Sequence, residues 1–273
     1  MKDNKITVFY DHIRNACEQS GENFETIAQK LTRAGIAGVE IEFDELLGEQ
    51  GELLAKTLSD NGLPVSSVFC HFRFEWETPA KDMIQVLSHL KKLGIHYLLV
   101  IPGFKKENES SRVSADALIP YVKKLCEEAP KYDVHVMMED FDSTAASFGT
   151  GEELKYYMDC VPELGCAFDT GNFFYFDEDA REALEALIDR VTYVHCKDRS
   201  TTVVPEENGN ETVGHIPMYA AAVGSGVIPM TEMLTKILAT GYEGPLAIEH
   251  FGSVKQLADM LSSAEYLKGL LHE

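Results

Sequence analysis

Short apolar runs rich in β-branched residues alternate with longer amphipathic stretches along the whole chain. Eight such pairs follow one another, with an average repeat of roughly 30 residues, which is the size of one strand–helix unit. Eight units without a break predict a closed parallel barrel, a single (β/α)8 (TIM) barrel domain over residues 1–273. The expected strands begin near Ile6, Gly38, Pro64, Ile95, Val134, Gly165, Val191 and Pro245.

The stretches between these runs carry the signals that start and stop helices. Asn23 is expected to cap one helix that ends at Gly35, and Thr78, followed by Pro79, is expected to open another that ends before Gly94. The segments TGEELKYYMDC and TEMLTKILATG follow the same pattern. An open, doubly wound sheet is the alternative fold, but the turn after the first expected strand lacks the GxGxxG of a nucleotide-binding turn.

Each of the last four expected strands carries one ionisable residue near its C-terminal end: Glu139 in VHVMMED, Asp169 in GCAFDTGN, His195 in VTYVHCKD and Glu249 in PLAIEHF. Successive side chains of a strand point to opposite faces, and the large apolar residues of these strands have the opposite parity. Because helices cover the outer face of a barrel, the apolar side chains fit there and the ionisable ones point inward. Active sites of this fold lie at that end of the strands.

Three carboxylates and one imidazole would therefore lie close together. Without a cation, the carboxylates would repel one another and raise each other's pKa. A ligand set of three oxygens and one nitrogen suits Mn²⁺, Mg²⁺ or Co²⁺, with Zn²⁺ as a further option. We predict one divalent metal ion bound by Glu139, Asp169, His195 and Glu249, with a metal-free polar network as the alternative. Asp140 and His250, each directly after a ligand, and Asp198, three residues after His195, should face away from the ion.

Composition narrows the range of partners. A formal net charge of −21 disfavours binding to the phosphate backbone of nucleic acids. No apolar run is long enough to span a membrane, and the N-terminal sequence MKDNKITVFYDH has no long apolar stretch of a signal peptide, so we expect a cytoplasmic protein. Six cysteines without a CxxC pair are typical of reduced thiols.

With these motifs, the chain resembles the sugar phosphate isomerase/epimerase superfamily of xylose isomerase-like TIM barrels. That group includes ketose 3-epimerases, hydroxypyruvate isomerases, inosose dehydratases and, more distantly, DNA-repair enzymes of the endonuclease IV type (AP endonuclease family 2). The resemblance implies a metal ion on the same four residues that parity selects. The DNA-repair branch needs further metal ligands and a basic face, which this acidic chain lacks. The resemblance extends over the whole chain and is carried by GVEIEF at 38–43, MMEDF around Glu139, AFDTGN at 167–172, VHCKD at 194–198 and AIEHF at 247–251.

The activity that the resemblance implies is proton transfer at a carbon next to the carbonyl of a small sugar or polyol, through an enediolate. Glu139 and Glu249, on strands separated by two others, are the expected acid and base. Returning the proton to the same carbon epimerises the substrate, returning it to the neighbouring carbon isomerises it, and expelling a β-hydroxyl dehydrates it. A metal-dependent isomerase or epimerase is the first hypothesis. An inosose-dehydratase-type lyase is the second, and a non-catalytic sugar-binding barrel is the third.

Five further residues are candidate substrate contacts: His71, Asn172, Lys197, Arg199 and Glu42. Lys197 shares the inward parity of His195, with a salt bridge at the rim as the alternative role. Asn172 stands where epimerases often have histidine, and the direction of Arg199, into the mouth or outward, is open. Glu40 also has inward parity and is a candidate buried group behind the metal ligands.

The longest stretch without a regular pattern runs from Arg199 to Gly226, and a loop of this length after a barrel strand is usually functional. A disordered insertion is the alternative. The glycines of Gly224-Ser225-Gly226, at its end, suit either a phosphate cradle or an ordinary turn before a helix. The ordinary turn is favoured, so the sugar is expected to be free rather than phosphorylated. Barrels of this kind often pair through their outer face, which allows a homo-oligomer.

Overall fold

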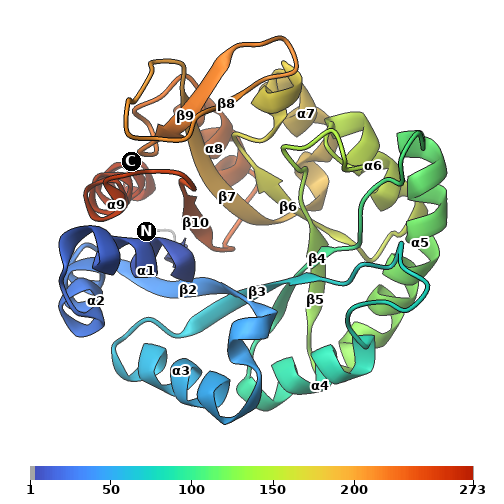
Figure 1. Ribbon diagram of the computed structural model, residues 1–273, viewed down its shortest axis with the longest axis horizontal. Coiled ribbons are helices and arrows are strands. Elements are labelled where there is room, and N and C mark those ends of the chain that lie inside the picture. Colours follow the sequence, from blue (N-terminus) through green and yellow to red (C-terminus); the bar gives the residue numbers. More distant parts are fainter. Residues whose placement is uncertain (1–3, 273) are drawn as a thin grey trace.

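The computed structural model describes residues 4–272, in which eight parallel strands form a closed barrel surrounded by helices (Figure 1). Strand β10 pairs with both β1 and β7, which closes the ring and excludes the open sheet. The predicted (β/α)8 barrel is therefore confirmed. Its strands are β1 (Ile6–Phe9), β2 (Ile36–Glu42), β3 (Val65–His71), β4 (Tyr97–Ile101), β5 (His135–Met138), β6 (Gly165–Asp169), β7 (Val191–Ser200) and β10 (Leu246–Glu249).

Every barrel strand begins within two residues of its predicted start, because the alternation of apolar segments marks strands more sharply than it marks their connections. The helices form the outer layer of the barrel (Figure 1). They are α1 (Tyr10–Ser20), α2 (Phe24–Arg33), α3 (Gly48–Asp60), α4 (Met83–Leu93), α5 (Ser111–Glu128), α6 (Gly151–Cys160), α7 (Ala180–Leu187), α8 (Met230–Ala239) and α9 (Gln256–His272). Single 3₁₀ turns lie at η1 (Phe43–Leu46), η2 (Ala129–Tyr132), η3 (Phe173–Phe176) and η4 (Ile188–Arg190).

Three of the expected helix caps are confirmed. The Asn23 side chain accepts a hydrogen bond from the Thr26 backbone N–H, 2.9 Å away, at the start of α2. Gly94, with a φ of 68°, ends α4 in the left-handed conformation that glycine adopts without strain. Thr150 forms a capping box with Glu153 at the start of α6.

Two other helix starts were predicted wrongly. Helix α4 begins at Met83, with Asp82 as its N-cap. The chain at Ala80 is not yet helical, because the Ala80 N–H donates to the Phe72 carbonyl. Thr78 and Pro79 therefore precede the helix instead of opening it. Helix α8 begins at Met230, after Pro229, with no side-chain cap.

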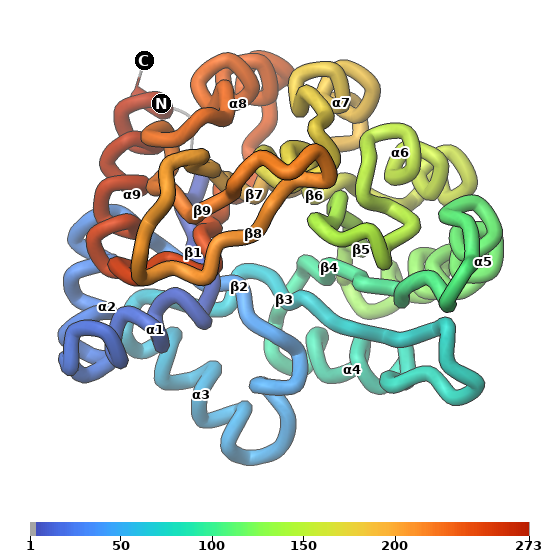
Figure 2. The backbone as a smooth tube through the Cα atoms, turned by 45° about the horizontal axis from the view of Figure 1, so that its top comes forward, coloured from blue at the N-terminus to red at the C-terminus, as the bar shows by residue number. Residues whose placement is uncertain are grey.

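The segment after β7 is ordered, so the disordered insertion is wrong. Strand β7 continues to Ser200, and β9 (Pro217–Ala221) folds back antiparallel along it, with Arg199 opposite Ala220. A short strand, β8 (Asn210–Glu211), pairs with the start of β9. In Figure 2 the orange segment with β8 and β9 passes in front of β1 and β7. We call residues 201–226 the insertion.

Inside the barrel, one small apolar layer lies apart from the main core between strands and helices: Leu99, Met137, Ala167, Tyr193 and Ala247. Four residues of this layer each stand two positions before an ionisable residue. The pairs are Met137 and Glu139, Ala167 and Asp169, Tyr193 and His195, and Ala247 and Glu249. The layer therefore forms the floor beneath the ionisable residues. Among the helices of residues 4–272, none has the length and hydrophobicity needed to cross a membrane.

Candidate metal centre

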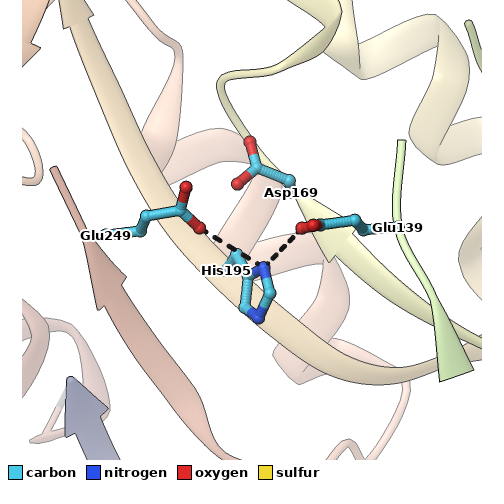
Figure 3. A group of neighbouring side chains, drawn as sticks. All are labelled: Glu139, Asp169, His195 and Glu249. Carbon is cyan, nitrogen blue, oxygen red and sulfur yellow. Dashed lines mark hydrogen bonds and ion pairs between the residues drawn. The ribbon is translucent and has the colours of Figure 1, made fainter. Parts of the chain in front are cut away.

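Four ionisable side chains from neighbouring strands converge above the floor of the barrel (Figure 3). Glu139 follows β5, Asp169 ends β6, His195 lies within β7 and Glu249 ends β10. Each offers one ligand atom, and these atoms all lie within 4.8 Å of one another. All four residues are buried, and Asp169 and His195 are fully so. Within the described residues, this buried cluster could hold a metal ion.

The Nδ1 atom of His195 faces the carboxylates of the cluster. It lies 2.8 Å from Oε2 of Glu139 and 3.4 Å from Oε2 of Glu249 (Figure 3). The other ring nitrogen, Nε2, lies 3.2 Å from Oε2 of Glu40, on β2. Ser67 donates to that same Glu40 oxygen across 2.6 Å. Glu40 is thus the buried group behind the ligands, and it leaves Nδ1 of His195 as the nitrogen available to an ion.

Asp169 is held with one oxygen engaged and one free. Its Oδ1 accepts the backbone N–H groups of Gly171 and Asn172, each across 2.7 Å. Its Oδ2 has no hydrogen-bond partner, and neither has Oε2 of Glu249. Buried carboxylate oxygens are normally satisfied. Two that lack a donor, beside an imidazole nitrogen, are suited to a cation.

Burial and mutual repulsion disturb the ionisation of the cluster. Burial is the main factor that raises the pKa of Asp169 well above its usual range, and the charges of Glu249 and Glu139 raise it further. Burial also raises the pKa of Glu139, despite the opposing effect of His195. For Glu249, burial is outweighed by the positive charges of Lys197 and His195, so its pKa is lowered. The two glutamates therefore have different surroundings.

Lys197 causes that difference. Its Nζ lies 2.6 Å from Oε1 of Glu249, since these two residues are directly opposite in the β7–β10 pairing. It also donates to Oδ1 of Asn172 across 2.6 Å and lies 3.5 Å from Oδ2 of Asp142. Burial opposes the charged ammonium, but Asp142 and Glu249 outweigh it and raise the Lys197 pKa. The side chain is therefore a buried cation that forms ion pairs with Glu249 and Asp142.

A cavity of about 440 Å³ opens beside the cluster. One part of its wall is polar and includes the two glutamates, Lys197 and Asn172, and another part is apolar. The apolar residues include Phe9 of β1, Phe69 of β3 and Ile101 of β4. The size is typical of a site for a small molecule.

The other candidate substrate contacts divide into two groups. His71, Asn172, Lys197 and Arg199 all line the cavity. Arg199 is buried and turned toward the mouth, where its Nη2 donates to Oδ2 of Asp142 across 2.6 Å. Glu42 is not among the lining residues. The chain turns into η1 directly after Glu42, so the inward parity of β2 no longer fixes its direction.

The three residues expected to face away from the ion lie outside the ligand cluster, in different surroundings. Asp198 accepts backbone N–H groups from the loop before α8, and His250 bonds to Gln256 and stacks on His12. Both carboxylate oxygens of Asp140 are buried without a partner, and burial beside Asp169 raises its pKa well above the usual range. Asp140 has no assigned role.

Sequence reasoning missed several lining residues. Phe9 and Phe69 stand at or near the C-terminal ends of their strands, so the rule that selected the ionisable residues would also have found them. Asp142, which lies 27% exposed between Lys197 and Arg199, comes three residues after Glu139 and carries no comparable signal. Glu207 and Tyr219 come from the insertion, where no periodicity exists to read.

Known proteins resemble this chain over nearly its full length. The inosose dehydratase of Geobacillus thermodenitrificans is 24% identical over 255 residues, which are 85% of this chain and 84% of that protein. The D-allulose 3-epimerase of a Methylomonas species has the same fold, with a TM-score of 0.70, 15% identity and 99% of both chains covered. The IOLI protein, solved with a bound zinc atom, has a TM-score of 0.72 at 13% identity, with 98% of both chains covered.

These proteins include a dehydratase and an epimerase, so the relatives are enzymes of more than one class. The structural likenesses, at such low identity, concern the fold alone. The family model described as "Xylose isomerase-like TIM barrel" matches residues 28–270, most of the chain. The chain therefore belongs to the xylose isomerase-like TIM barrel family.

Proposed function

We propose that this protein is a divalent-metal-dependent isomerase or epimerase that moves a proton at a carbon next to the carbonyl of a small sugar or polyol. The observation that carries the proposal is the convergence of Glu139, Asp169, His195 and Glu249 within 4.8 Å, beside a cavity of small-molecule size. Glu139 directly follows β5 and Glu249 ends β10, and β6 and β7 lie between these two strands. The two glutamates can therefore face a bound substrate from two sides.

The donor set fits a divalent ion. Three carboxylates and one imidazole nitrogen are ligands that such ions accept. Among the described residues, Oδ2 of Asp169 and Oε2 of Glu249 receive no hydrogen bond. We propose these four residues as the ligands, with Mn²⁺, Mg²⁺ and Co²⁺ ahead of Zn²⁺. When bound, the ion would polarise the substrate carbonyl and offset the negative charge that proton removal creates.

The two glutamates would carry the proton. Glu139 forms no ion pair with a lysine, so its carboxylate would be the one that removes the proton. Glu249 is held by the Lys197 ammonium at 2.6 Å, so the proton that this pair returns to the substrate would come from the ammonium. Lys197 would regain a proton from solvent as Glu139 releases the one that it took. Asn172, bonded to Lys197, fixes the position of the ammonium and offers its amide to substrate hydroxyls.

The test is solvent deuterium exchange with the Mn²⁺-loaded protein and a panel of free ketoses and keto-cyclitols. Glu139→Gln and Glu249→Gln should each lower deuterium uptake by about 10²- to 10⁴-fold, the usual range for loss of a general acid or base. Glu206→Gln, an exposed residue of the insertion, is the control and should exchange normally. Full exchange in both glutamine variants would sink the two-glutamate scheme.

A lyase of the inosose dehydratase kind is the second candidate. The observations that favour it are the inosose dehydratases among the relatives and the unequal surroundings of the two glutamates. One carboxylate would remove the proton, and the Lys197–Glu249 pair would protonate the departing hydroxyl. Mass spectrometry of the products separates the two: a product lighter by one water identifies the lyase, and an unchanged mass identifies the isomerase or epimerase. Metal-dependent turnover of no panel member would favour a non-catalytic sugar-binding barrel.

A further inference from the structure

The insertion brings a buried carboxylate to the cavity. Glu207 is 9% exposed and lines the cavity together with its neighbours Asn208 and Asn210. Its Oε2 accepts the backbone N–H of Ala220 across 3.2 Å, and Ala220 lies opposite Arg199 in the β7–β9 pairing. The side chain is therefore tied to β9, which pairs with β7, the strand that carries His195 and Lys197.

The other oxygen of this carboxylate has no donor. Oε1 of Glu207 is buried without a hydrogen-bond partner, as is Nε of Arg199, which also lines the cavity. The backbone at Glu207 is fixed by bonds from its own N–H to Val204 and from the Gly209 N–H to its carbonyl. A buried carboxylate oxygen left without a donor is unfavourable, because it has given up its hydrogen bonds to water and gained none in the protein. A bound hydroxyl group would satisfy it.

The amides that could have received a phosphate are already occupied. The backbone N–H groups of Gly224 and Gly226 both donate to Oδ2 of Asp198, each across 2.9 Å. The N–H of Ile228 donates to Oδ1 of Asp198 across 3.1 Å. This loop after β7, which in many barrels helps to bind phosphate, here binds a carboxylate of its own chain. Gly224-Ser225-Gly226 is thus an ordinary structural turn.

The unpaired groups of the cavity match one kind of ligand. A hydroxyl both donates and accepts, so the hydroxyls of a polyol can donate to the Glu207 carboxylate and accept from the Arg199 guanidinium. A phosphate dianion only accepts, and its charge would be repelled by Glu207. The two cations of the wall are already paired, Lys197 with Glu249 and Arg199 with Asp142.

We propose that Glu207 is a specificity-determining residue, which binds a substrate hydroxyl in the part of the cavity bounded by the insertion and excludes phosphate esters. The inference rests on the proposed function for the presence of a substrate, and it adds the substrate class, an uncharged polyol. Glu207 has no part in the proton transfer itself, so its loss should act on binding, and hence on KM more than on kcat.

The experiment measures binding of free polyols and their phosphate esters to Mn²⁺-loaded protein. The probes are D-fructose, myo-inositol, D-fructose 6-phosphate and myo-inositol 1-phosphate. Glu207→Gln keeps an oxygen for the Ala220 N–H but presents an amide donor to the ligand, and it should weaken binding of the free polyols about 10-fold or more. Glu206→Gln, exposed on the neighbouring position, is the matched control. Mn²⁺ affinity and the thermal unfolding midpoint should stay the same in both variants.

The possible outcomes test the role of Glu207 separately from the proposed catalytic function. Preferential binding of the free polyols that Glu207→Gln weakens supports the role of Glu207, even if no deuterium exchange occurs and the catalytic proposal fails. Tighter binding of a phosphate ester, unchanged binding in Glu207→Gln, or no binding of any free polyol overturns the role of Glu207. The first two of these results leave the metal and exchange experiments, on which the catalytic proposal depends, unaffected.

Discussion

Residues at or near the C-terminal ends of the barrel strands line both sides of the cavity, but they are ionisable on one side and mainly apolar on the other. On the side of β5, β6, β7 and β10, the inward residues at the strand ends are ionisable, and they converge around the imidazole of His195. On the side of β1, β3 and β4, the corresponding wall contains Phe9, Phe69 and Ile101. Position in the barrel therefore decides that a side chain reaches the cavity, and residue type decides what it can do there.

The difference gives the two sides separate tasks. The ionisable side can hold a cation and move a proton, which requires charges that would be costly to bury without partners. The side with Phe9, Phe69 and Ile101, here called the aromatic side, can pack against the carbon skeleton of a substrate. Removing this apolar surface from water favours binding. Substitutions on the two sides should therefore affect different measurements.

The largest effect is expected from Asp169→Asn. This change removes a charge and a free ligand oxygen from the cluster while leaving an acceptor for the Gly171 and Asn172 amides. Mn²⁺ affinity, measured by isothermal titration calorimetry, should fall about 100-fold or more, because even loss of an outer partner of a metal ligand costs 10- to 100-fold. Asp198→Asn is the matched control on the next strand, since Asp198 bonds only to backbone N–H groups and should leave Mn²⁺ affinity unchanged. Equal losses in both would contradict the assignment of Asp169 as a ligand.

A smaller effect on the same side is expected from Glu40→Gln. The Glu40 carboxylate accepts from Nε2 of His195 and from Ser67, and the amide replacement would weaken its hold on the imidazole. Mn²⁺ affinity should fall about 10- to 100-fold, the range for residues that orient metal ligands. Glu42→Gln is the control from the same strand, because Glu42 does not line the cavity. Unchanged affinity in Glu40→Gln would mean that His195 is oriented without Glu40.

The smallest effect is expected from Phe69→Ala on the aromatic side. The ring lines the cavity and packs on Phe9, with ring centroids 5.9 Å apart. Its loss should raise KM about 10-fold through lost apolar contact, with kcat and Mn²⁺ affinity nearly unchanged. Trp76→Ala, an exposed aromatic outside this cavity, is the control for general effects on the fold. A loss of Mn²⁺ affinity in Phe69→Ala would show that the two sides are not separate.

Parity predicted the converging residues because two regularities combine in a barrel. A strand alternates its side chains strictly, and closure brings neighbouring strand ends to one place, so Asp169 and His195 lie opposite each other. Glu42 does not line the cavity, because the strand ends there and η1 begins. The helix predicted to open at Thr78 begins only at Met83, because the Ala80 N–H bonds to the carbonyl of Phe72, outside the helix. Periodic reasoning therefore holds only while the element continues.

By itself, the sequence determined the eight strand–helix units and the inward direction of Glu139, Asp169, His195 and Glu249, because strand and helix periods are local properties of the chain. Only the tertiary structure decided what each of these groups contacts. Lys197 opposite Glu249, Glu40 behind His195, and Glu207 beside Ala220 are pairs from different strands and loops. Their partners depend on how the barrel closes and how the insertion folds back, and no local pattern encodes those distances.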